Sequence, residues 1–180
     1  MHDPASHSAQ ARLIDCLLRL APGDGLHTTA IPGLKLVRVS GPSAMGEVLY
    51  QPALCLLAQG SKQLLVGEAR IAQDSARHMV YVHDILVSGQ VVEASPQQPY
   101  LSVWLDIDPA AIACLLLADV HRAAAPKVVP DATLGIYSAR TEEHLLDALL
   151  RLCQLLETPR HIPQLAPLIY REIMYRLLTD

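Results

Sequence analysis

The sequence predicts a mainly β domain with a helix before it and helices after it. Between residues 26 and 107, apolar pieces of roughly four to eight residues alternate with turn residues, which is the pattern of a sandwich, jelly roll or barrel. The run 87–109 contains a long apolar strand, a polar turn built on Pro96 and Pro99, and a second strand of alternating character. Beyond residue 108 the apolar spacing becomes helical.

The first segment has the features of an amphipathic helix over residues 4–20. Asp3 can cap the helix and Pro4 can occupy its first turn. The apolar residues that follow at helical spacing are Leu13, Cys16, Leu17 and Leu20. The Pro-Gly-Asp-Gly sequence at 22–25 ends the helix. We expect residues 1–25 to form an N-terminal helix or arm, and we hypothesise that this arm is mobile and modulates ligand response.

The second segment, residues 26–108, is predicted to be a β-barrel. Glycine tolerates the positive φ of tight turns, so Gly60 and Gly67 predict two successive hairpins. In the strand that follows residue 99, two sets of residues alternate between its faces. One set is Leu101, Val103, Leu105 and Ile107, and the other is Tyr100, Ser102, Trp104 and Asp106.

The third segment, residues 109–180, is predicted to be helical. Asp108 and Pro109 begin a short apolar helix, and a linker over 119–140 contains Pro126 and Pro130. Thr141 is expected to cap a second helix over 142–157, and Pro163 to open a third, so that the last two helices form an α-hairpin. Four leucines form one stripe of the second helix: Leu145, Leu149, Leu152 and Leu156. We predict that this stripe is a dimer contact; packing in the core is the simpler alternative.

Composition limits the functions that this chain can perform alone. The net charge is -4 and the pI is about 6.0, without a basic stripe, which argues against direct binding to nucleic acid. The four cysteines form no C-x-x-C pair and stand among apolar residues, so we expect buried reduced thiols and neither a disulfide framework nor a zinc site. The apolar patch 13–20 is too short to cross a membrane, which favours the cytoplasm.

Catalytic motifs are missing from the sequence. There is no G-x-S-x-G, P-loop or G-x-G-x-x-G pattern, so we expect no enzyme activity and no cofactor. A histidine-bound metal is the alternative, because small β-barrels can hold a metal on two histidines of one strand. His78 and His83 are the nearest candidates, but their spacing puts them on opposite faces of one strand. We therefore predict no metal site.

Several side chains could line a small-molecule pocket inside the barrel. Pockets combine aromatic faces with a few convergent polar groups. The candidate ligand-binding residues are Tyr50, Gln59, Lys62, His78, Tyr81, Glu93 and Trp104. Glu93 lies in an apolar strand, where it is either a polar anchor for a ligand or a solvent-facing residue at the strand end; the second alternative is favoured.

Four stretches resemble the N-terminal part of AraC-type bacterial transcription regulators. These stretches are LYQPALCLLAQG (49–60), GQVVEAS (89–95), PYLSVWLDIDP (99–109) and LAPLIYREIMYRLL (165–178). The resemblance runs from about residue 33 to the C-terminus.

The resemblance implies a cupin-like jelly roll followed by helices. It also implies that the domain senses a small-molecule effector, supports a homodimer, and meets DNA only through a C-terminal helix-turn-helix unit that is absent from these 180 residues. The alternative function is a stand-alone cupin-type small-molecule binder or a metal-dependent enzyme.

Overall fold

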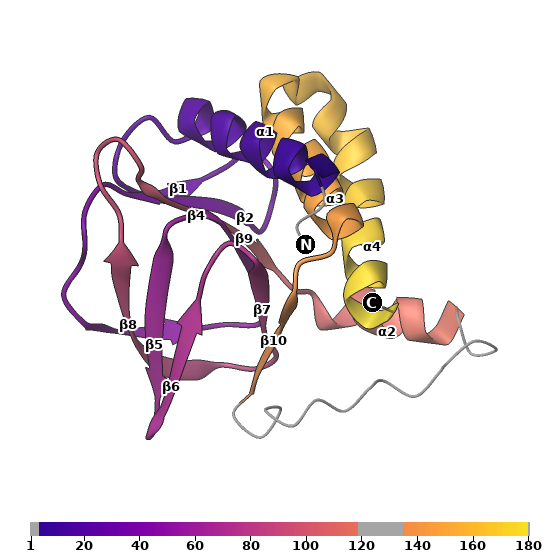
Figure 1. Cartoon of the computed structure of the whole chain (residues 1–180). Helices are drawn as coiled ribbons and strands as arrows, with labels where there is room; N and C mark the ends of the chain where they lie inside the picture. Colours follow the sequence, from indigo (N-terminus) through magenta and orange to yellow (C-terminus); the bar gives the residue numbers. More distant parts are fainter. Residues whose placement is uncertain (1–3, 119–134, 180) are drawn as a thin grey trace.

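Two antiparallel sheets face each other in the computed structural model, which describes residues 4–118 and 135–179. The larger sheet has the order β1 (Gly25–Thr28), β2 (Leu34–Val39), β9 (Tyr100–Asp106), β4 (Ala53–Gln59), β7 (Arg77–Tyr81) and β10 (Ile136–Arg140). The smaller sheet has the order β3 (Gly46–Tyr50), β8 (Ile85–Glu93), β5 (Ser61–Val66) and β6 (Ala69–Gln73). Figure 1 shows this barrel on one side of the molecule, the helices that follow residue 108 on the other, and the N-terminal helix across the top of the barrel. The predicted mainly β fold, a cupin-like jelly roll with flanking helices, is confirmed.

The chain changes sheets where the sequence predicted the first hairpin. β4 pairs with β7 and β9, whereas β5 pairs with β6 and β8, so the turn at Gly60 is a corner between the sheets. Gly60 has φ +84°, and a Cβ there would lie 2.6 Å from the carbonyl oxygen of Glu93. Only glycine fits this position without strain, and it lets the chain turn sharply from β4 into β5 although these two strands do not pair with each other. The hairpin predicted at Gly67 is confirmed by the pairing of β5 with β6.

Both faces of the larger sheet are buried, because one faces the barrel interior and the other faces the helices. In β9, Leu101, Val103 and Leu105 belong to the core beneath the helices. Tyr100 and Trp104 belong to the interior between the sheets. The predicted alternation in this strand is therefore confirmed.

Helix α1 (Pro4–Leu20) confirms the predicted helix but is no detached arm. Leu13, Cys16 and Leu17 are at most 1% exposed and join the core beneath the helices. The helix contacts α3 and β4, and the side-chain amide of Gln10 donates to the carbonyl of Ala58 at 3.0 Å. A free arm would have to expose this apolar surface to water, so the mobile-arm hypothesis does not fit the structure.

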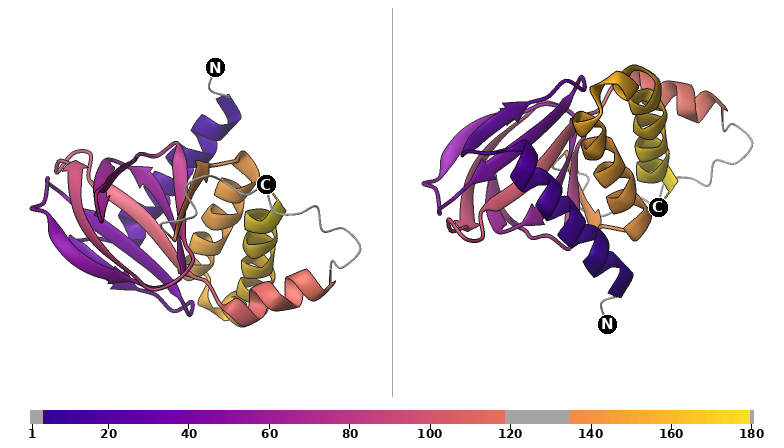
Figure 2. Two further views of the ribbon diagram at one scale, coloured as in Figure 1. Left: turned by 90° about the horizontal axis from the view of Figure 1, so that it is seen from below. Right: turned by 90° about the horizontal axis from the view of Figure 1, so that it is seen from above.

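The C-terminal part contains a strand as well as helices. Its helices are α2 (Pro109–Ala118), α3 (Glu143–Gln154) and α4 (Ile162–Thr179), with 3₁₀ turns η2 (Leu155–Glu157) and η3 (Pro159–His161) between the last two. α3 and α4 form the predicted α-hairpin (Figure 2). The predicted linker 119–140 lies outside the described residues up to 134, and its last five residues form β10, which pairs with β7.

Two local predictions about α2 and α3 are wrong. The residue before α3 is Glu142, without a side-chain cap, and the amide of Thr141 instead donates to the carbonyl of Ala76. Cys114 is exposed because α2 extends away from the barrel, as Figure 2 shows; the other three cysteines are buried. Asp108 does cap α2 as predicted, since its carboxylate accepts from the amide of Ala110 at 2.9 Å.

The leucine stripe of α3 is core and is not available for dimer contacts. Leu145 is 3% exposed, and both Leu149 and Leu152 are fully buried. Leu156 is partly buried and packs against the same cluster. Because α3 packs against α1 and α4 and the three leucines belong to the core, the predicted dimer contact is wrong and the simpler alternative is right.

Candidate functional site

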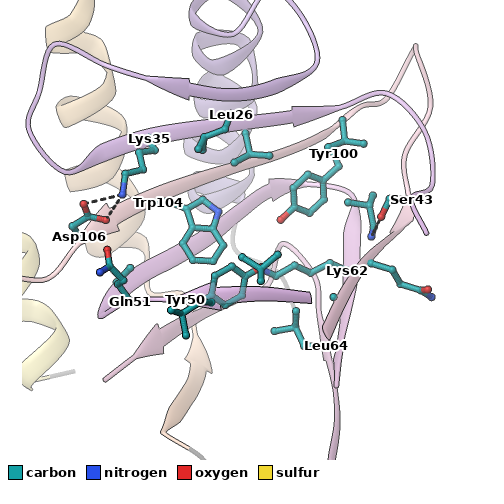
Figure 3. A pocket seen from close by; sticks show the side chains of 18 residues that line it. Leu26, Lys35, Ser43, Tyr50, Gln51, Lys62, Leu64, Tyr100, Trp104 and Asp106 are labelled. Atoms are coloured by element: carbon teal, nitrogen blue, oxygen red, sulfur yellow. Dashed lines mark hydrogen bonds and ion pairs between the residues drawn. The ribbon is translucent and has the colours of Figure 1, made fainter. Parts of the chain in front are cut away.

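A cavity of about 440 Å³ lies between the two sheets (Figure 3). Strands of both sheets contribute to its walls, which are predominantly apolar. The described residues that line it are Leu26, Lys35, Val37, Val39, Ser43, Val48, Leu49, Tyr50, Gln51, Ala53, Lys62, Leu64, Gly89, Gln90, Val91, Tyr100, Trp104 and Asp106. The volume falls within the range of small-molecule pockets in proteins, about 300–1,000 Å³.

The cavity opens between the edge strands of the two sheets. β1 is the first strand of the larger sheet and β3 is the first strand of the smaller one. Their lining side chains Leu26, Val48 and Leu49 are 63%, 45% and 61% exposed. Exposed apolar side chains at a concave site favour binding of an apolar group.

Aromatic rings form the inner wall. The ring centroids of Tyr50 and Trp104 are 4.7 Å apart, and Tyr81 stacks on Trp104 at 5.4 Å. Burial, with a smaller contribution from Cys55, raises the pKa of Tyr50 to about 12, so its phenol stays protonated near neutral pH. Such a wall offers flat apolar faces and uncharged hydroxyl groups to a ligand.

Lys62 is buried against these rings, 5% exposed. Its Nζ lies 4.6 Å from the ring centroid of Trp104 and 5.6 Å from that of Tyr50, and it donates to the Sγ of Cys55 at 3.4 Å. Burial raises the pKa of Cys55, although Lys62 lowers it in part, so the thiol is uncharged near neutral pH. The side-chain amide of the buried Gln73 donates to the carbonyl of Cys55 at 3.1 Å.

A second polar group lies at another part of the wall. The Nζ of Lys35 is 2.8 and 2.9 Å from the two carboxylate oxygens of Asp106 (Figure 3). The carbonyl of Asp106 accepts from the hydroxyl of Tyr170 on α4 at 3.2 Å, and the same hydroxyl accepts from the amide of Asp108 at 2.8 Å. The end of β9 thus joins the cavity wall to α4 and to the start of α2.

The structure brings together four of the residues that the sequence singled out. Tyr50, Lys62 and Trp104 line the cavity, and Tyr81 stacks directly behind them. Lys62, Tyr81 and Trp104 converge because every second side chain of β5, β7 and β9 points between the sheets, and Tyr50 joins them from the end of β3.

The other three predicted ligand-binding residues lie elsewhere. The amide of Gln59 donates to the carbonyl of Pro99 and ties two turns together. His78 is buried on β7, where Met79 and Tyr81 face the interior, so His78 is on the opposite face. Glu93 is exposed at the end of β8, as its favoured alternative predicted. These three do not line the cavity.

Sequence reasoning missed the Lys35–Asp106 pair and Tyr170. The alternation of residues in β2 could have predicted that Lys35, Val37 and Val39 share one face of that strand. What the sequence lacked was the pairing of β2 with β9, which sets Lys35 beside Trp104 and within reach of Asp106.

The described residues contain neither a cluster of metal-binding side chains nor a membrane-spanning helix. Within 4–118 and 135–179, no group of three or more His, Cys, Asp and Glu side chains is arranged to hold a metal ion. No helix in the described part of the chain is long and apolar enough to cross a membrane.

Comparison with known proteins identifies one family. The AraC-type transcriptional regulator N-terminus matches residues 30–180. No curated protein matches the sequence.

Among solved structures, two of ToxT from Vibrio cholerae are similar in fold. Apo ToxT K231A has a TM-score of 0.54 at 6% identity over 83% of this chain. Unsaturated-fatty-acid-bound ToxT has a TM-score of 0.51 at 9% identity over 88%. The alignments span 57% and 60% of the respective ToxT chains, so this chain corresponds to little more than half of such a protein.

Proposed function

Because this chain belongs to the family of N-terminal domains of AraC-type transcription regulators, we propose that its barrel binds a small-molecule effector and controls a C-terminal helix-turn-helix unit. The barrel, residues 26–108, receives the effector, and residues 109–180 carry the response. In this proposal the domain binds its ligand without transforming it, and it acts in the cytoplasm.

The cavity between the sheets is the observation that carries the proposal. It combines an apolar mouth, an aromatic wall and two lysines, which is the composition of a pocket for a small organic molecule. The fatty-acid-bound state of ToxT supports a small organic ligand for a barrel of this fold.

Asp106 provides the route from the cavity to the helices. Its carboxylate holds Lys35 at the cavity wall, while its carbonyl accepts from Tyr170 of α4. A ligand that displaces Lys35 or moves the end of β9 therefore alters the hydrogen bond between Asp106 and Tyr170, and with it the position of α4 against the barrel. An effector acts by binding one arrangement of these elements more tightly than another.

We also propose that the domain forms a homodimer through its helical part. With the α3 stripe buried, the exposed apolar side chains of α4 are the better candidates: Leu165, Leu168 and Tyr175 are 41%, 65% and 41% exposed.

A matched pair of cavity variants tests the effector site. Val91 lines the cavity, whereas its neighbour Val92 is 44% exposed on the other face of β8. In a thermal-shift screen of common metabolites, a ligand at a hundredfold above its Kd adds about 2.7 kcal/mol to the free energy of unfolding. That increment corresponds to roughly 5–10 °C in Tm for a chain of this length.

We expect Val91→Phe to abolish the shift, because the larger side chain projects into the cavity and obstructs the ligand, and Val92→Phe to retain it. A shift that survives Val91→Phe unchanged would put the ligand outside the barrel.

A further inference from the structure

The charges that line the cavity do not balance. Among the described lining residues, Lys35 and Lys62 are cationic and Asp106 is the sole carboxylate. Asp106 is held by Lys35 through both of its oxygens. No ion pair within the described residues includes Lys62, and its Nζ donates a hydrogen bond to the thiol of Cys55, whose pKa is raised by burial. One buried positive charge is therefore left without a counterion.

A buried charge of this kind destabilises a protein unless a partner is supplied. The rings of Tyr50 and Trp104 offset part of this loss through cation–π contacts, but they carry no negative charge. An apolar side chain in place of Lys62 would therefore give the free protein a higher free energy of unfolding. Such a departure from the rules of core packing is typical of a binding site.

Resting on the effector function proposed above, we propose that the ligand is an organic carboxylate with an apolar or aromatic body. Its carboxylate accepts hydrogen bonds from the Nζ of Lys62, and its body lies along Tyr50 and Trp104. The far end points to the mouth, where Leu26 and Leu49 provide apolar contacts. Lys62 is then the residue that selects acids over neutral molecules of the same shape.

The test is a titration with ω-phenylalkanoates of increasing chain length, each paired with its primary amide. Trp104 is the single tryptophan of the chain and lines the cavity, so its fluorescence reports occupancy directly; calorimetry gives a second measure of Kd. We expect the acids that bind to do so about ten- to hundredfold more tightly than their amides, since a hydrogen bond to a charged group is worth that much.

Three variants locate the discrimination. Lys62→Met should bring the acid-to-amide ratio of affinities to about one, whereas Lys35→Met/Asp106→Asn, which removes both charges of the ion pair, and the surface control Arg70→Met should preserve it. Lys62→Met should also raise the unfolding midpoint of the free protein, which a structural lysine would not do. The stability readout holds whether or not a compound binds.

Each outcome decides between the proposals. Equal affinities for acids and amides in the wild-type protein, or discrimination that follows Lys35, overturn the carboxylate assignment and leave the effector pocket standing. A lower unfolding midpoint in Lys62→Met, with acids and amides weakened alike, makes Lys62 structural and also overturns it. If no acid or amide changes the fluorescence or gives heat, the carboxylate assignment is overturned, whereas the effector pocket itself stands or falls with the metabolite screen and the Val91→Phe variant.

Discussion

Replacing both Leu149 and Leu152 by glutamate is expected to unfold the domain. Both side chains are fully buried among residues of α1, α3 and the larger sheet. Each substitution loses the burial of a leucine, about 2–5 kcal/mol in comparable core truncations. It also places a carboxylate where no partner exists, which costs more. The sum is of the order of the whole stability of a domain, about 5–15 kcal/mol.

Circular dichroism and urea denaturation measure this effect. The matched control is Leu165→Glu with Leu168→Glu on the exposed face of α4, which should stay folded and dissociate any dimer. A folded Leu149→Glu/Leu152→Glu protein that changes only its sedimentation coefficient would contradict the buried position of the α3 stripe and restore it as an interface.

Deleting residues 1–22 is expected to abolish cooperative unfolding. The deletion removes Leu13 and Leu17, which are at most 1% exposed, and uncovers Leu54 and Leu56 on the outer face of β4. Full burial of a leucine stabilises by about 1.5–3 kcal/mol, and the deletion loses burial on both sides of the contact.

A milder variant measures the same contact without truncation. Leu17→Ala should lower the free energy of unfolding by about 2–5 kcal/mol. Arg12→Ala, at an exposed position of the same helix, should change it by less than about 0.5 kcal/mol. A truncated protein that keeps its barrel and its unfolding midpoint would show that α1 is a dispensable arm after all.

Local patterns predicted most elements of the fold but not which strands pair. Periodicity and turn residues were sufficient for α1, β9 and the α3–α4 hairpin, because those signals are encoded within a few residues. The corner at Gly60 was mistaken for a hairpin, since a glycine with positive φ serves either turn and the choice depends on distant strands. β10 was missed for the same reason: its partner β7 lies more than fifty residues earlier.

The sequence was sufficient to select candidate site residues by their type, but it was not sufficient to tell which of them face the cavity. Tyr50, Lys62, Tyr81 and Trp104 stood out as aromatic or polar groups in apolar strands, and the structure brings them together. The face of the sheet on which His78 lies was not predictable from its own strand.

The link from Asp106 to Tyr170 joins residues 64 positions apart and exists only in the folded chain. The leucine stripe of α3 illustrates the converse problem, since an apolar helix face fits a core and an interface equally well.

Amide hydrogen exchange with the tightest-binding compound of the thermal screen tests the central claim most directly. The claim is that a ligand between the sheets is felt at α4 through the end of β9. It predicts slower exchange in β2, in β9 and in α4 when the compound is bound, with all three effects lost in Val91→Phe and kept in Val92→Phe. Protection confined to α2 and α4, with β2 and β9 unchanged, would contradict it.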